Sequence, residues 1–138
     1  MLEQAETQRS DTIEGAVARF YAALEVFLTG DLRPMTEVWS HAEDVTYLSP
    51  SGTFRVGWGE VFADWKEQAE LKLGGRVKPR DVHLLTAPGA EVAVVQNREV
   101  GEIGSGARVD IRVTNVFRRE EGSWKMVSHH ADLLPFLH

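Results

Sequence analysis

The stretch that decides the fold is ARVDIRVTNVFRREEGSWKMVSHHADL, which spans residues 107–133. Both arms are rich in β-branched and aromatic residues, and they predict two strands joined by a tight turn at Glu121 and Gly122. Glycine suits such a turn because it accepts the positive φ that a two-residue connection requires. The turn fixes the expected cross-strand pairs as Arg119 with Trp124, Phe117 with Met126, Asn115 with Ser128, Val113 with His130 and Ile111 with Asp132.

This register places Asn115, His130 and Asp132 on one face of the sheet, because side chains alternate between the two faces of a strand. The opposite face then carries His129 and Arg112. Both faces mix apolar and polar residues, so we expect one to cover a core or cavity and the other to meet something else, such as a second subunit. A one-residue β-bulge would exchange the two sets of side chains, and the sequence leaves this open.

Composition and charge exclude several classes of protein. With 138 residues the chain is most simply one domain that is large enough to bury a core. A net charge of −6 disfavours sequence-independent binding to nucleic acid, and the lack of cysteine excludes disulfides and thiolate chemistry. The first residues are polar, unlike a secretion signal, and no apolar run approaches the roughly 18 residues of a membrane-spanning helix. We therefore expect a cytoplasmic protein with no membrane partner.

Hydrophobic spacing predicts helices early in the chain and strands late. Residues 1–10 are expected to form a flexible lead, and a single domain is expected over residues 11–138. Asp11, with Glu14 three residues later, predicts a capping box for a long helix that ends at Gly30. Further helices are expected at 31–40 and 57–73, and further strands at 45–48, 53–56, 77–86 and 92–100. The apolar tail 133–137 is expected to dock against the body or a partner.

This order of elements predicts an α+β fold, in which about three N-terminal helices pack on one face of a curved antiparallel sheet. The chain resembles the nuclear transport factor 2-like superfamily, and within it the SnoaL-like and ketosteroid isomerase-like small proteins. The resemblance is most specific in VWSHAEDVTYLSPSGTFRVGWGEVFADW (38–65) and TNVFRREEGSWKMVSHH (114–130). It implies a cone in which a bent sheet wraps the first helix and encloses a pocket, and a homodimer formed through the outer sheet face. The superfamily hosts isomerases, cyclases, dehydratases and hub domains, so the fold alone does not imply a function.

The positions that carry function in those relatives differ here. The resemblance places the general-base aspartate of the steroid isomerases at Ser49, and a serine without an adjacent base cannot abstract a proton from carbon. The late acid of the SnoaL-type cyclases has a loose counterpart in Asp132. The arginines that line the pocket of the kinase-hub branch are replaced by Asn97 and Asn115, which implies a less cationic pocket.

Two groups of polar residues are candidates for chemistry. His129 and His130 are adjacent in a strand and point to opposite faces, so they cannot bind one metal together. His130 is either a proton shuttle at the pocket wall or a hydrogen-bonded structural histidine. Asn97 and Asn115 lie mid-strand, where they either orient a ligand or satisfy each other or a buried water, since an unpaired buried amide costs roughly 1–3 kcal/mol.

These observations predict an apolar pocket with a few convergent polar groups, which is the usual form of a small-molecule site. Its expected lining is Trp39, Tyr47, Trp65, Asn97, Asn115 and His130. One hypothesis is a cofactor-free acid–base enzyme of the isomerase or cyclase type, in which His130 and Asp132 move protons on a small apolar carbonyl or aromatic compound. The alternative is a non-catalytic ligand-binding or dimeric assembly module. No spacing matches a metal signature, so neither a metal nor a cofactor is expected.

Overall fold

The structure is a computed structural model that describes residues 12–137. The expected lead over residues 1–10 and the expected capping residue Asp11 lie outside the described residues. The elements are α2 (Ile13–Phe27), α3 (Arg33–Val38), β1 (Thr46–Leu48), β2 (Phe54–Val56), α4 (Trp58–Ala69), β3 (Gly75–Leu85), β4 (Val92–Ile103), β5 (Ala107–Glu120), β6 (Ser123–Ala131) and the short 3₁₀ helix η1 (Pro135–Leu137). The predicted order of helices and strands is confirmed.

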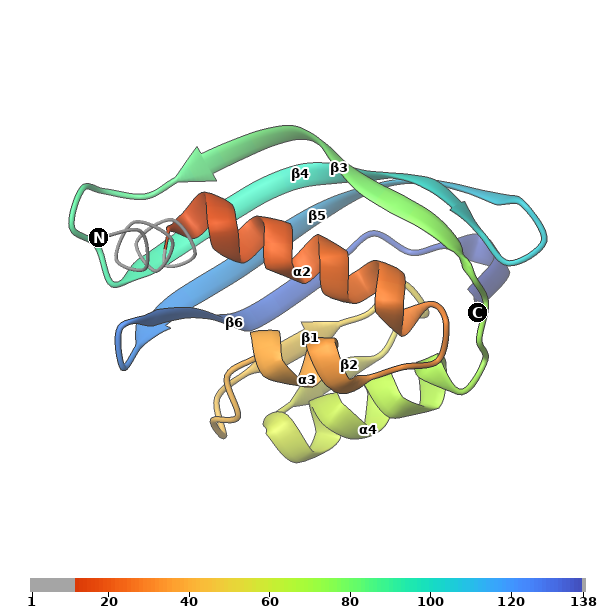
Figure 1. The fold of residues 1–138 in the computed structure, drawn as a ribbon, viewed down its shortest axis with the longest axis horizontal. Coiled ribbons are helices and arrows are strands. Elements are labelled where there is room, and N and C mark those ends of the chain that lie inside the picture. The colour runs from red at the N-terminus through yellow and green to blue at the C-terminus, as the bar shows by residue number, and fades with distance from the viewer. Residues whose placement is uncertain (1–11, 138) are drawn as a thin grey trace, which may run out of the picture.

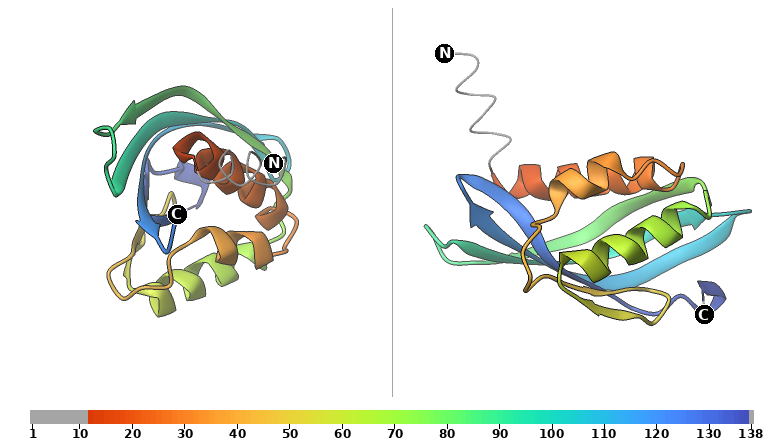
Figure 2. Two further views of the ribbon diagram at one scale, coloured as in Figure 1. Left: turned by 60° about the vertical axis from the view of Figure 1, so that its left-hand side comes forward. Right: turned by 90° about the horizontal axis from the view of Figure 1, so that it is seen from below.

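The six strands form one bent sheet in the order β2-β1-β6-β5-β4-β3. The sheet curves around α2, and α4 packs beneath β1 and β2, so that the interior is closed by helices on one side (Figure 1). The view along the molecule in Figure 2 shows the same wrapping of the long strands around α2. The sheet is mixed, because β1 runs parallel to β6 while its other strands pair antiparallel. The expectation of a purely antiparallel sheet is therefore corrected at β1, which joins the edge of the closing hairpin after two helices.

The long helix α2 buries one stripe against the sheet and ends where the sequence predicts. Its N-cap is Thr12, whose hydroxyl accepts a hydrogen bond from the Gly15 N–H at 3.0 Å. Seven of its residues are buried, and Tyr21 is the one among them with a polar side chain. Gly30 has a φ of 104° and its N–H returns to Phe27, which terminates the helix.

The closing hairpin contains a β-bulge that changes the predicted register. Glu121 and Gly122 both have positive φ, as the two-residue turn requires, and Phe117 pairs with Met126 as expected. Val127 then has no partner on β5, and beyond it Asn115 faces His129.

The predicted pairs beyond the bulge are wrong by one residue. His129 is buried, and His130 is exposed on the outer face. On the other edge of β6, Trp39 pairs with Met126 and β1 pairs from Ser128 onward. The bulge lies at the junction between these two neighbours.

The other edge of the sheet is irregular, and the C-terminal tail docks as expected. β3 is an edge strand, and its register shifts between Arg80 and His83, just after Pro79. Leu134 is buried, and its N–H donates to the Pro50 carbonyl at 2.8 Å, so the tail docks against the body.

Candidate active site

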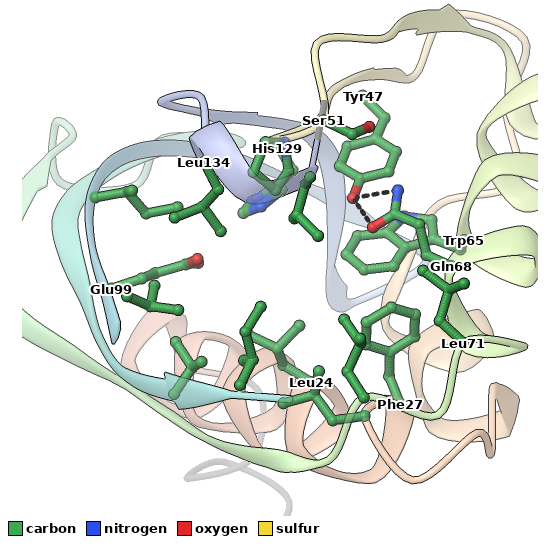
Figure 3. Close-up of a pocket in the computed structure, with 18 residues that line it drawn as sticks. Leu24, Phe27, Tyr47, Ser51, Trp65, Gln68, Leu71, Glu99, His129 and Leu134 are labelled. Atoms are coloured by element: carbon green, nitrogen blue, oxygen red, sulfur yellow. Dashed lines mark hydrogen bonds between the residues drawn. The ribbon is translucent and has the colours of Figure 1, made fainter. Parts of the chain in front are cut away.

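A cavity of about 110 Å³ lies between α2, α4 and the inner face of the sheet. Most of its wall is apolar: Leu24, Phe27, Leu28, Pro50, Trp65, Leu71, Leu73, Val77, Ile103, Val109, Ile111, Leu134 and Leu137. Glu99 from β4 and His129 from β6 enter the same space from different parts of the sheet (Figure 3). Tyr47, Gln68 and Ser51 supply the remaining polar groups of the wall. An apolar cavity with a few convergent polar groups is the usual form of a site for a small molecule.

Glu99 is an acid in an apolar environment. Glu99 is 5% exposed. One of its carboxylate oxygens, Oε2, accepts a hydrogen bond from the Tyr21 hydroxyl at 2.8 Å. Burial raises the pKa of Glu99 to about 7, and the Tyr21 hydrogen bond acts in the opposite direction. Near neutral pH this carboxyl therefore exists in both forms, which is the condition that suits a general acid or base.

Tyr21 is the centre of a buried hydrogen-bonded chain behind the cavity wall. Its oxygen accepts from the amide nitrogen of Asn97 at 2.9 Å and from that of Asn115 at 3.4 Å. Burial, and then the charge of Glu99, raise the pKa of Tyr21 well above its ordinary value. The phenol is thus a permanent hydrogen-bond donor to Glu99.

His129 ends this chain on the other side of the cavity. Its Nδ1 lies 2.5 Å from Oδ1 of Asn115, and the residue is 3% exposed. The rings of Phe20, Tyr47 and Trp65 lie 5.1, 5.7 and 6.1 Å from the imidazole, centroid to centroid. Burial lowers the pKa of His129 to about 3, with a smaller contribution from His130. The imidazole is therefore neutral throughout the physiological range.

A second polar chain lies behind the wall formed by β1 and α4. The ring of Tyr47 stacks on Trp65 at 4.4 Å, and its oxygen accepts from the Gln68 amide at 3.1 Å. The same amide donates to Asp64 at 2.7 Å, and Asp64 also accepts from Arg55 at 3.1 Å. Burial raises the pKa of Tyr47 well above its ordinary value, so its hydroxyl keeps its proton.

The structure divides the residues that the sequence predicted for the site. Tyr47 and Trp65 line the cavity, whereas Trp39 packs behind them, 6.2 and 6.3 Å from their rings. Asn97 and Asn115 are buried and bonded to Tyr21, one layer behind the wall.

His130 and Asp132 do not face the cavity, so that part of the prediction is wrong. His130 is exposed on the outer face, because the bulge at Val127 reverses the side to which it points. Asp132 pairs with Arg112 at 2.8 Å, and hydrogen bonds from this arginine lower the pKa of the carboxyl.

Sequence reasoning missed Glu99, His129 and Tyr21 as members of the site. Asn97 was expected to line the pocket, and Glu99 lies two residues further along the same strand and on the same face, so the sequence carried a signal for Glu99. His129 was hidden by the bulge. Tyr21 lies among the buried, mostly apolar residues of α2, and its partners are 76 to 94 residues away in sequence. No local pattern reveals contacts of that separation.

Two further properties concern residues 12–137. Within this range no three histidine, aspartate or glutamate side chains come close enough together to hold a metal ion. No helix in the same range is both long enough and apolar enough to cross a membrane.

A bent sheet that wraps a long helix and encloses an apolar cavity is the architecture of the nuclear transport factor 2-like superfamily. Residues 13–134 match the model of the SnoaL-like domain, and the chain belongs to this family. No curated protein matches the sequence at a significant level.

Three solved structures illustrate the likeness. A protein from Thiobacillus denitrificans, provisionally assigned as a calcium/calmodulin-dependent protein kinase type II association domain, is 31% identical, with a TM-score of 0.77 over 89% of this chain and 95% of that chain. A protein from Streptomyces avermitilis, provisionally assigned as a dehydratase, is 25% identical, with a TM-score of 0.73 over 87% and 92% of the two chains. A protein from Shewanella frigidimarina, provisionally assigned as a ketosteroid isomerase, is 15% identical and shares the fold, with a TM-score of 0.68 over 88% and 96%.

Proposed function

We propose that this protein is a cofactor-free acid–base enzyme of the isomerase type that acts on a small, largely apolar carbonyl compound, with Glu99 as the general base. The observation that supports this best is a buried carboxyl, with a pKa of about 7, that faces an otherwise apolar cavity. A base with this pKa combines a substantial ionised fraction at neutral pH with a strong tendency to accept a proton.

The proposed reaction moves one proton between two carbons. Ionised Glu99 takes a proton from the carbon next to the carbonyl, and the electron pair of the broken C–H bond moves into an enolate. The protonated carboxyl then returns the proton to another carbon of the same conjugated system, so no cofactor or net proton is consumed. Tyr21 holds the carboxylate in place through its hydrogen bond.

The enolate oxygen needs a hydrogen-bond donor, and Tyr47 is the candidate on the opposite wall. Its oxygen already accepts from Gln68 at 3.1 Å, while its own proton has only a 3.3 Å contact with the oxygen of the same amide. This proton can turn toward a ligand at little cost, since 3.3 Å is longer than a normal O–H···O hydrogen bond.

Deuterium exchange tests the proposal without knowledge of the natural substrate. Cyclohexanone and 2-cyclohexenone are incubated with the protein in D₂O, and loss of the proton signal next to the carbonyl is followed by NMR. The wild type should exchange at least about 100-fold faster than Glu99→Gln, which is the lower end of typical general-base contributions. His130→Ala is the matched control, because His130 lies outside the cavity, and it should retain the wild-type rate. Equal rates in wild type and Glu99→Gln would refute the assignment of Glu99 as the base.

We also propose that the chain forms a homodimer through the outer face of the sheet, and the association-domain relative makes an assembly module the second candidate function. Leu85, Val94 and Val116 lie side by side across three strands of that face, and Leu85 is 57% exposed. Val94 and Val116 are half-buried, so the row is partly exposed, and an apolar row of this kind is typical of an interaction surface. Light scattering should report a dimer at micromolar concentration that Leu85→Glu converts to monomer, and a monomeric wild type would contradict the proposal.

A further inference from the structure

We propose that the cavity takes an uncharged molecule whose hydroxyl group donates a hydrogen bond to Nε2 of His129. This inference names the substrate class of the proposed enzyme, and as a statement about substrate it rests on the proposed function. It follows from the direction of every hydrogen bond in the buried chain between Glu99 and His129. That direction is fixed because each group has a known number of donors and acceptors.

The direction is set at a backbone carbonyl. The Arg98 carbonyl can only accept, so the side-chain atom of Asn97 that lies 3.0 Å away must be the amide nitrogen. The second proton on this nitrogen points to the Tyr21 oxygen at 2.9 Å. Tyr21 therefore accepts a hydrogen bond from Asn97.

Tyr21 passes the same direction on to Asn115. When Glu99 is ionised, the single proton of Tyr21 goes to its carboxylate at 2.8 Å, because an ionised carboxylate only accepts. With that proton engaged, the phenol oxygen can only accept from Asn115, whose nearest atom at 3.4 Å is its amide nitrogen. The other end of this amide, the oxygen Oδ1, is thereby turned toward His129.

The tautomer of His129 is the consequence. Oδ1 of Asn115 has no proton, so Nδ1 of His129 must be the donor of the bond between them. Burial keeps the imidazole neutral and lowers its pKa to about 3, so the single ring proton is on Nδ1. Nε2 is left with a lone pair, and no hydrogen bond from the described part of the chain reaches it. Since His129 lines the cavity, the partner of Nε2 is a donor that a ligand brings.

The rest of the wall restricts the ligand further. Among residues 12–137 the cavity lining includes Glu99 and no lysine or arginine, so the wall repels a carboxylate or phosphate rather than binding it. Nε2 bears a lone pair and resists protonation, so His129 cannot give a proton to a departing hydroxyl. In this tautomer His129 therefore holds the hydroxyl without protonating it. Tyr21 and Asn115 are positioning residues, since they act on the ligand through Glu99 and His129.

The first experiment reads the tautomer directly in the full-length wild-type protein. Long-range ¹H–¹⁵N correlation spectra at pH 9, where Glu99 is ionised, should show a protonated Nδ1 and an unprotonated Nε2 for His129. This pattern is diagnostic, because a free histidine side chain in water prefers the opposite tautomer. A protonated Nε2 would overturn the inference, and the measurement needs no variant and no turnover.

The second experiment compares probes of nearly equal size. Phenol should bind at least about tenfold more tightly than fluorobenzene and should shift the Nε2 resonance of His129, whereas benzoate should not bind. The tenfold preference corresponds to one ordinary hydrogen bond. In His129→Phe the preference should disappear, and in the matched control His130→Phe, whose side chain lies outside the cavity, it should persist.

The outcomes separate this inference from the proposed function. Equal affinities for phenol and fluorobenzene in the wild type, or tight binding of benzoate, would overturn the ligand class. Phenol has no C–H bond next to a carbonyl, so its binding is independent of proton abstraction by Glu99. If the wild-type protein failed to catalyse deuterium exchange but still preferred phenol, the proposed isomerase activity would be refuted. The hydroxyl-binding site would remain supported.

Discussion

Glu99→Gln and His129→Gln should give folding stability opposite dependences on pH between pH 5 and 6. The pKa of Glu99 is raised by burial from 4.5 to about 7, so in this range the folded state holds a proton that the unfolded state has released. The stability that Glu99 contributes is fully present below pH 4.5 and is lost as the pH rises through 7. The pKa of His129 is lowered by burial from 6.5 to about 3, so here the unfolded state holds the extra proton. Its contribution is present above pH 6.5 and is lost as the pH falls toward 3.

The two effects nearly cancel in the wild type. Around pH 5.5 the folded and unfolded states differ by close to one bound proton at each group. Each difference changes the free energy of unfolding by about 1 kcal/mol per pH unit. The two slopes have opposite signs. In Glu99→Gln only His129 still contributes to this slope, so the free energy of unfolding should fall by about 1 kcal/mol from pH 6 to pH 5. In His129→Gln only the Glu99 carboxyl still contributes, so the same change of pH should raise the free energy of unfolding by about 1 kcal/mol.

Urea unfolding followed by tryptophan fluorescence at intervals between pH 5 and 6 measures these slopes. Glutamine preserves a hydrogen-bonding partner at both positions, an acceptor for Tyr21 and a donor for Asn115. His130→Gln changes an exposed histidine and should run parallel to the wild type. Carboxylates held by arginines, such as Asp132, have lowered pKa values and titrate below this window. If both variants ran parallel to the wild type, the reasoning that burial shifts these two pKa values would be refuted.

Two further substitutions test the fold around the site. Tyr21→Phe removes the donor to Glu99 and one acceptor from each of two buried amides, so stability in urea unfolding should fall by about 2–4 kcal/mol. The same variant should raise the pKa of Glu99 in a ¹³C carboxyl titration, because the lost hydrogen bond lowers it, and an unchanged value would contradict this account. Gly101→Ala would place a Cβ 1.9 Å from the Arg76 carbonyl oxygen, so unfolding in urea should show a loss of at least about 3 kcal/mol. Gly59→Ala meets nothing within 4 Å in a helix and should be neutral or slightly stabilising, and a similar loss in both variants would refute the steric explanation.

The sequence predicted the elements well and the inner wall of the cavity poorly, for a physical reason. Helices and strands follow from spacing and turn residues, which are local, and the turn at Gly122 was placed correctly. The face to which a strand residue points depends on every residue between it and the turn, so the single bulge at Val127 was enough to exchange His129 and His130. The inward direction of Glu99 could have been predicted, because side chains alternate along a strand and Glu99 lies two residues after Asn97. The chain through Tyr21 could not, because it joins a helix to two strands that are distant in sequence.

The unpaired Val127 has a practical consequence for comparisons within the family. Two members that differ by the loss or gain of one such residue keep the same backbone path while their downstream side chains trade places between interior and solvent. An ungapped alignment across this hairpin would then match an inward imidazole in one protein with an outward one in the other. Residues should be equated after superposition of the strands, and a double histidine at this point signals that the alignment frame must be checked.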